Sequence, residues 1–120
     1  MQRFALLTHP PLRFEEAERL GKDLGLSEDA LADYLEISKK TLSRRRSEGA
    51  MSAAESLRLG MLSTALRQAS EVLGDPARAS RWLSAPLLSL EGRAPLELLT
   101  SHAGYEQVRA ALLRQAYGMF

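Results

Sequence analysis

The stretch from residue 38 to residue 46 combines basic and hydroxyl side chains, the types that bind nucleic acid. Five bases and no acid occupy positions 39 to 46, whereas positions 15 to 36 hold eight acids and two bases. Arginine can contact guanine through two hydrogen bonds, and lysine or threonine can hold a phosphate. The residues that we predict to contact DNA are Ser38, Lys39, Lys40, Thr41, Ser43, Arg44 and Arg46.

Two short helices must position this basic stretch. Ser27 is a suitable N-cap for a helix over 28–35, and Ser38 is one for a second helix over 39–48. Small and apolar residues around the intervening turn have the spacing of a helix–turn–helix motif. These residues are Ala32, Leu35, Ile37 and Leu42. We therefore predict a helix–turn–helix whose second helix carries the basic residues.

Two positions depart from the usual helix–turn–helix pattern. Glu36 stands in the turn where glycine is usual, and Arg45 stands where the second helix often buries an apolar residue. Either departure can weaken DNA binding, and the sequence leaves this open. The alternative is that the basic run forms only a solvated cationic face, because charge runs usually lie on the surface.

No arrangement of residues in the sequence is typical of a catalytic or metal centre. The two histidines, His9 and His102, lack a second histidine, cysteine or carboxylate pair at ligand spacing. Ser101 precedes His102, but no oxyanion motif or orienting acid accompanies them. The chain has no cysteine, which excludes disulfides and thiolate catalysis. We expect no catalytic residue, no metal and no cofactor, and therefore a protein that is not an enzyme.

The composition favours helices over strands. Apolar residues make up 45% of the 120-residue chain but aromatic residues only 6%, so leucine and alanine must build the core. The net charge is only +1. No apolar run approaches the roughly 18 residues of a membrane span, and no signal-peptide pattern is present, so we expect a soluble cytoplasmic protein. We predict an all-α fold with an N-terminal arm and helix–turn–helix lobe over residues 1–50 and a C-terminal helical lobe over residues 51–120.

A long helix is predicted to join the two lobes. Ser52 and Glu55 have the spacing of a capping box, and the helix runs to about Leu73 before Gly74. Its apolar residues form two neighbouring stripes, Leu57, Met61, Ala65, Ala69 and Val72 on one and Leu59, Leu62, Leu66 and Leu73 on the other. A surface this broad must be covered on two sides. It also suggests a homodimer, which suits a palindromic operator.

Residues 79–99 are predicted to form a helix, a buried irregular corner and another helix. Pro86 forces the residue before it out of the helical region, and Gly92 favours a turn. Pro95 fits the first position of a new helix, where its missing N–H costs nothing. We assign a structural role to four residues of this corner, Trp82, Pro86, Gly92 and Pro95. A final helix is expected from Tyr105 to about Ala116.

A series of different short motifs runs from Ile37 to the last residue of the sequence. They are Ile37-Ser38 with Thr41-Leu42 and Arg44-Arg45, Ser52 with Glu55-Ser56 and Arg58, Trp82-Leu83 with Pro86, Leu90 with Gly92-Arg93, Pro95 and Leu98-Leu99, and the closing Tyr117-Gly118-Met119-Phe120. With these motifs the chain resembles the Xre/MbcA/ParS-type antitoxin family, whose members pair with RES-domain toxins. Glu36 and Glu91 stand where that family has glycines, and Lys40 stands where it has arginine.

The resemblance implies a two-part protein in which a helix–turn–helix part is followed by a toxin-binding domain. It implies a RES-domain toxin partner that consumes NAD or transfers ADP-ribose, and an antitoxin that covers the toxin's active-site cleft while the complex represses its own operon. Cationic, aromatic and soft apolar side chains near the last residue suit such a cleft. We expect toxin contacts from Arg93, Arg114, Tyr117, Gly118, Met119 and Phe120.

The sequence leaves two alternatives to the antitoxin interpretation open. The aromatic residues at the end of the chain can instead fold back onto their own core. The whole chain can also be a free-standing helix–turn–helix transcriptional regulator, whose C-terminal lobe serves only for dimerisation.

Overall fold

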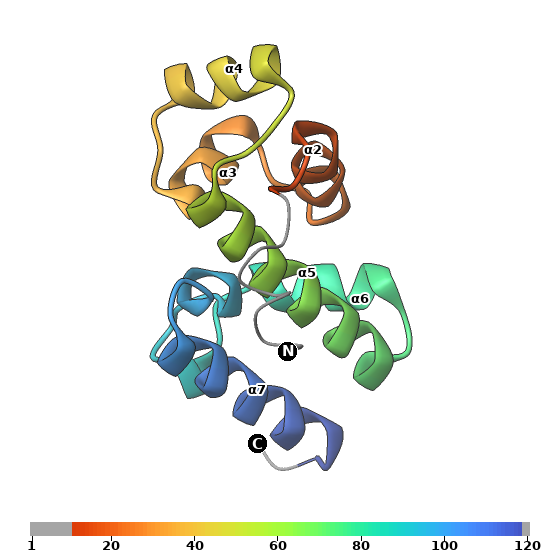
Figure 1. The fold of residues 1–120 in the computed structure, drawn as a ribbon. Coiled ribbons are helices and arrows are strands. Elements are labelled where there is room, and N and C mark those ends of the chain that lie inside the picture. Colours follow the sequence, from red (N-terminus) through yellow and green to blue (C-terminus); the bar gives the residue numbers. More distant parts are fainter. Residues whose placement is uncertain (1–10, 119–120) are drawn as a thin grey trace, which may run out of the picture.

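The computed structural model describes residues 11–118, which form six α-helices and two short 3-10 helices (Figure 1). The predicted all-α fold is confirmed, since these residues contain no β-strand and only two isolated bridges. In chain order the elements are α2 (Phe14–Asp23), α3 (Glu28–Leu35), α4 (Lys39–Glu48), α5 (Ala53–Leu73), α6 (Pro76–Ser84), η1 (Leu88–Leu90), η2 (Pro95–Leu98) and α7 (His102–Ala116).

Serine caps set the starts of the helices around the predicted helix–turn–helix. The hydroxyls of Ser27, Ser38 and Ser52 each accept the backbone N–H of the residue three positions on, which satisfies a donor that the helix leaves unpaired. Gly49 and Gly74 end α4 and α5 in the left-handed conformation that favours glycine. The predicted bounds of these helices are therefore confirmed.

The last helix begins one turn earlier than predicted. Ser101 caps α7 by accepting the N–H of Gly104, so the helix starts at His102 and not at Tyr105. Gly104 is required inside this first turn, because a Cβ there would lie 1.8 Å from the carbonyl oxygen of Leu98. The glycine that seemed to precede the helix in fact lets η2 pack against it.

Helix α5 is the central element and contacts elements of both lobes, including α3 near its start and α6 and α7 along its length (Figure 1). Leu59 and Leu62 are fully buried, as predicted for their stripe. The expectation that the stripe containing Leu57 is covered as well is wrong at Leu57 itself, which is 70% exposed, because no described element packs over that side of the first turns of α5.

Hydrogen bonds from polar side chains tie the helix–turn–helix to the C-terminal lobe. The buried Tyr34 hydroxyl of α3 lies 2.7 Å from the carbonyl oxygens of both Arg58 in α5 and Leu99 after η2. Burial raises the pKa of Tyr34, an effect that the nearby Arg58 charge partly offsets. The Ser80 hydroxyl of α6 also donates to the carbonyl oxygen of Asp23 at the end of α2. These hydrogen bonds connect the N-terminal lobe directly to the C-terminal lobe.

The corner between α6 and α7 has the predicted backbone. Ala85 is extended ahead of Pro86, Gly92 is in the left-handed region and the buried Pro95 begins η2. Glu91, where the resembling family has glycine, is also left-handed with φ of 58°. Backbone hydrogen bonds between Leu87 and Arg93 and between Gly92 and Leu87 close this loop.

The corner is packed on one face only, which corrects the expectation that it is buried throughout. Leu90 and Leu99 are buried and Trp82 is half-buried, but Pro86 is exposed and Leu88 is 98% exposed. Leu88 is the first residue of η1, and this short helix buries Leu90 while Leu88 and Ser89 face solvent.

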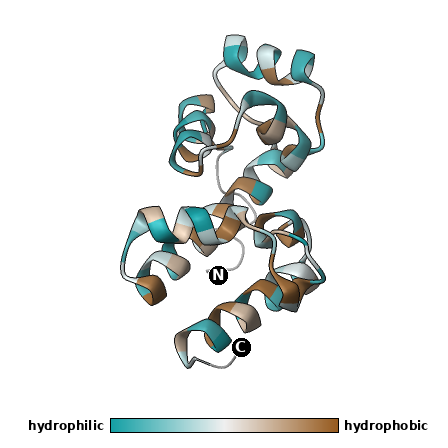
Figure 2. Cartoon of the chain, turned by 180° about the vertical axis from the view of Figure 1, so that it is seen from behind, coloured by the Kyte–Doolittle hydropathy of each residue, from teal (hydrophilic) through white to brown (hydrophobic). Residues whose placement is uncertain are grey.

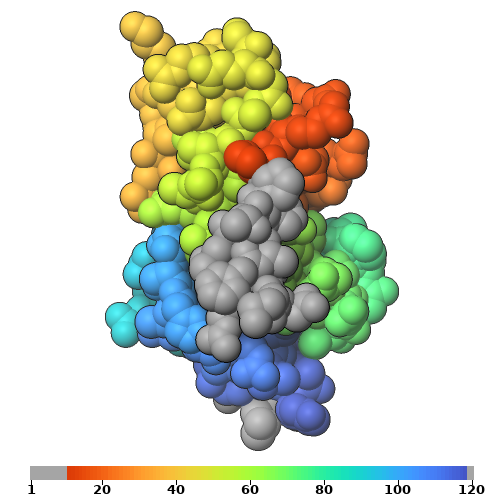
Figure 3. All heavy atoms as spheres, in the orientation of Figure 1, coloured from red at the N-terminus to blue at the C-terminus, as the bar shows by residue number. Residues whose placement is uncertain are grey.

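The described residues form a flattened molecule, with principal extents of 44 × 38 × 24 Å. Helix α4 forms one end of the molecule and α7 lies at the other, with α5 between them (Figures 1 and 3). Within residues 11–118 no helix combines the length and the apolar character that crossing a membrane requires. The lobe boundary between residues 50 and 51, just before α5, stays a prediction.

Candidate nucleic-acid interface and C-terminal surface

Helix α4 presents a polar outer face at the end of the molecule. Lys40, Ser43, Arg44 and Ser47 are exposed and recur at the spacing of a single helical face. Leu42, on the opposite side, is almost fully buried against the rest of the helix–turn–helix. The hydropathy colouring shows α4 as a mainly hydrophilic helix (Figure 2). This geometry leaves the outer face free to lie against a large polar surface.

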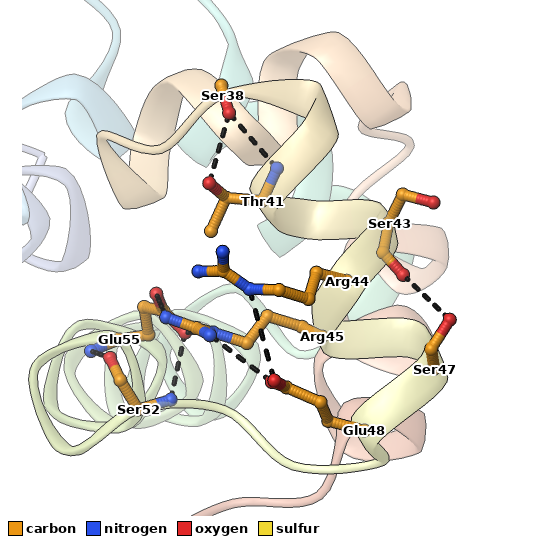
Figure 4. Close-up of polar contacts among 9 residues, drawn as sticks. All are labelled: Ser38, Thr41, Ser43, Arg44, Arg45, Ser47, Glu48, Ser52 and Glu55. Carbon is orange, nitrogen blue, oxygen red and sulfur yellow. Dashed lines mark hydrogen bonds and ion pairs between the residues drawn. The ribbon is translucent and has the colours of Figure 1, made fainter.

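The side of α4 next to α5 carries an ion pair that the sequence did not reveal. The Arg45 guanidinium donates to both carboxylate oxygens of Glu55, at 2.7 and 2.9 Å (Figure 4). Only 17% of the Arg45 side chain and 6% of the Glu55 side chain are exposed. Arg45 therefore does occupy an inward position of the second helix, but it fills that position with a charge that is paired.

Glu55 joins this pair to the start of α5. Its carboxylate also accepts the N–H of Ser52, whose hydroxyl accepts the N–H of Glu55 in the predicted capping box (Figure 4). The hydrogen bond from Arg45 holds the pKa of Glu55 below its ordinary value, although burial opposes this effect. The same bond raises the pKa of Arg45 above its ordinary value. Both groups stay charged at neutral pH.

The turn of the motif is held by a second ion pair. Glu36 adopts the left-handed conformation, with φ of 59°, that glycine usually provides at this position. Its carboxylate accepts from Arg58 Nη1 at 2.9 Å, and this hydrogen bond lowers the pKa of Glu36. Arg58 also donates to the carbonyl oxygen of Tyr34 at 3.2 Å. The glutamate therefore keeps the turn geometry and adds a contact to α5.

The residues predicted to contact DNA do not share one face. Lys40, Ser43 and Arg44 point outward, together with Ser47, which the prediction missed although it continues their helical spacing. Ser38 and Thr41 are hydrogen-bonded to each other at the helix start (Figure 4).

The remaining two predicted DNA-contacting residues lie along the sides of α4. The Lys39 ammonium is 3.1 Å from Asp29 Oδ1. Arg46 pairs with Glu28, and its guanidinium carbon lies 5.1 Å from the centre of the Phe14 ring. Both side chains thus contact groups of the chain itself and not only solvent.

The acidic and basic segments, which are separate along the sequence, lie side by side in the structure. Four of the five bases of α4 have a carboxylate within 4.0 Å, from the start of α3, the end of α4 or the start of α5. Within the described part of the chain, Lys40 is the base of this helix without such a partner. The acidic segment borders the basic helix.

The C-terminal candidates lie at two separate places. Arg93 is exposed on the corner, between η1 and η2, whereas Arg114 and Tyr117 lie at the C-terminal end of α7. Helix α7 itself has fifteen residues and is therefore roughly 20 Å long. Tyr117 is 74% exposed, so it does not fold back onto the core. Gly118 follows with a positive φ, and Met119 and Phe120 lie outside the described residues.

No metal centre is evident in the described part of the chain, where no group of three or more histidine, cysteine or acidic side chains gathers. His102 is exposed as the first residue of α7, and His9 lies outside the described residues.

Replacing Glu55 with glutamine tests the depressed pKa. A group whose pKa is lowered on folding contributes stability above its unfolded-state pKa, about 4.3 for glutamate, and this contribution is lost as the pH falls through the folded-state value. We therefore expect Glu55→Gln to lower the unfolding free energy at pH 7 and to flatten its fall between pH 5 and pH 3, measured by urea unfolding. Glu106→Gln, which changes an exposed acid on α7, is the control, and equal pH profiles for the two variants would contradict the assignment.

Comparison with known proteins matches each half of the chain to a domain of an antitoxin family. Residues 7–63 match the antitoxin Xre-like helix–turn–helix domain, and residues 68–118 match the antitoxin Xre/MbcA/ParS C-terminal toxin-binding domain. The chain is 35% identical over 83 residues to an antitoxin Xre of Pseudomonas putida, across 68% of this chain and 52% of that protein. It thus spans about half the length of this curated relative. The two domain matches meet within α5, and together they show that this chain belongs to the Xre/MbcA/ParS antitoxin family.

Proposed function

We propose that this chain is the antitoxin of a type II toxin–antitoxin system, acting by binding and without catalysis of its own. Its partner is a RES-domain toxin that consumes NAD or transfers ADP-ribose, and the chain neutralises it by covering the active site. It also binds operator DNA and represses its own operon. The observation that carries the proposal is the pairing, in one chain, of a helix–turn–helix domain match with a toxin-binding domain match.

The outer face of α4 supports the DNA-binding part of the proposal. Its four exposed residues present one ammonium, one guanidinium and two hydroxyls, which are groups that bind phosphates and base edges. The ion pair between Arg45 and Glu55 holds the inner side of the same helix against α5, so the orientation of α4 relative to α5 is fixed and its outer face points away from α5.

The end of α7 supports the toxin-binding part. Exposed Tyr117 and partly exposed Leu113 are one helical turn apart, so they share one side of the helix, with Arg114 next to Leu113. Aromatic and arginine side chains contribute strongly to protein interfaces when they become buried there. The resemblance extends this surface to Met119 and Phe120.

The proposal also includes self-association of the chain, which suits a two-fold symmetric operator. Leu57, exposed near the start of α5, is an apolar residue that a second copy of the chain can cover. We therefore include a homodimer in the proposal, since paired helix–turn–helix units read two half-sites.

Co-expression with the product of the adjacent gene tests toxin neutralisation. We expect that product to stop growth when expressed alone and the full chain to restore growth. Removing Tyr117 to Phe120 is expected to abolish the rescue, and Tyr117→Ala to weaken it, because the proposed interface loses its aromatic side chain. Leu88→Ala removes a more exposed apolar side chain from the corner of the same domain and is expected to leave the rescue intact.

Two results of this experiment would contradict the proposal. A harmless neighbouring product would favour the free-standing regulator, whose C-terminal lobe only dimerises. Rescue by the shortened chain, combined with loss of rescue in Leu88→Ala, would move the toxin contact from the end of α7 to the corner.

Titration of a duplex from the region upstream of the gene tests operator binding. Lys40→Ala is expected to weaken binding about equally for operator and scrambled duplexes and to reduce the salt-dependence slope by about one, as for a phosphate contact. Arg67→Ala removes an exposed base from α5 and serves as the control. The same slope in both variants would show that the outer face of α4 does not contact DNA.

A further inference from the structure

The acids Glu28 and Asp29 form a border along the proposed DNA-binding helix. They are the first two residues of α3, yet their carboxylates pair with bases of α4 on the other side of the turn. Asp29 lies 3.1 Å from the Lys39 ammonium, and Glu28 pairs with Arg46. Residues that are separated along the chain by 10 and 18 positions thus meet at the edge of one surface.

Fold stability alone gives little reason for this arrangement. All four side chains are exposed, and exposed ion pairs contribute little because water and salt screen them. Acids in the first turn of α3 do favour that helix, but any acidic pair there would do so without reaching α4. The contact between the two helices is the feature that needs another explanation.

DNA phosphates would compete directly with these carboxylates. A phosphate that binds Lys39 or Arg46 must displace Asp29 or Glu28, and the displaced carboxylate then stays close to the negatively charged backbone. Non-specific DNA binding depends almost entirely on lysine and arginine contacts to phosphate, whereas specific binding adds contacts to base edges. The acidic border therefore weakens the non-specific mode more than the specific one.

We propose that Glu28 and Asp29 are specificity-determining residues, which keep Arg46 and Lys39 occupied until a matching operator supplies base contacts to the outer face of α4. The inference rests on the proposed binding of operator DNA. Each of these two bases carries its own counter-charge in the unbound chain.

The test measures binding of the full chain to an operator duplex and to a scrambled duplex across a range of salt concentrations. Asp29→Asn, Glu28→Gln and the double variant are expected to bind the scrambled duplex several-fold more tightly, with a slope steeper by about 0.9 for each freed base. The operator duplex gains less, so the ratio of the two affinities falls. Asp29→Glu keeps the carboxylate and is expected to restore wild-type behaviour.

Glu106→Gln is the matched control, because it removes one exposed, ion-paired acid from α7 and changes the net charge equally. Thermal unfolding checks that every variant is folded. If the chain binds duplexes but the variants behave as Glu106→Gln does, or their affinity ratio rises, the specificity role is wrong while operator binding stands. If the unmodified chain binds neither duplex at any salt concentration, the proposed DNA binding itself is wrong, and the specificity role is wrong with it.

Discussion

The buried ion pair between Arg45 and Glu55 is the constraint on which the placement of α4 depends. It joins the inner side of α4 to the first turn of α5, where Glu55 also closes a capping box with Ser52. Removing one partner from a buried pair costs roughly 3–5 kcal/mol, since the other charge is left uncompensated. We expect the lower end here, because 17% of the Arg45 side chain remains in contact with solvent.

Helix α5 connects the Arg45–Glu55 ion pair to the rest of the molecule. Its first turn holds α4, its Arg58 holds the Glu36 turn, and its buried leucines pack in the core with residues of the C-terminal lobe. The Tyr34 hydroxyl then reaches from α3 to the end of η2. The helix–turn–helix is therefore oriented relative to the C-terminal lobe by specific polar contacts as well as by the core.

Local signals made much of the fold predictable. Serine caps, glycines in the left-handed conformation and a proline at a first helical position each act over a few residues, and they located the ends of α3, α4 and α5 and the start of η2. The start of α7 was missed because Gly104 resembles a helix-breaking residue, while its function is close packing against Leu98.

Interactions between elements were the part that the sequence could not reveal. Arg45 seemed to disrupt an apolar position because its partner Glu55 lies in the next helix, and no local pattern connects the two. The acidic and basic segments seemed separate for the same reason, although the turn folds Asp29 back against Lys39. Leu88 belongs to the corner that was predicted to be buried, but it begins η1 on the side of that helix that faces solvent.

Arg44 and Arg45 provide the most direct test of this account. Both carry one positive charge, but the Arg44 side chain is exposed on the outer face of α4 whereas the Arg45 side chain is paired with Glu55 on the inner side. The measurement is the melting temperature and the operator affinity of Arg44→Met and Arg45→Met, side by side. We predict that Arg45→Met lowers the melting temperature by about 10 °C, whereas Arg44→Met leaves it unchanged and weakens operator binding. An equal loss of stability in the two variants, or full operator affinity in Arg44→Met, would contradict the account.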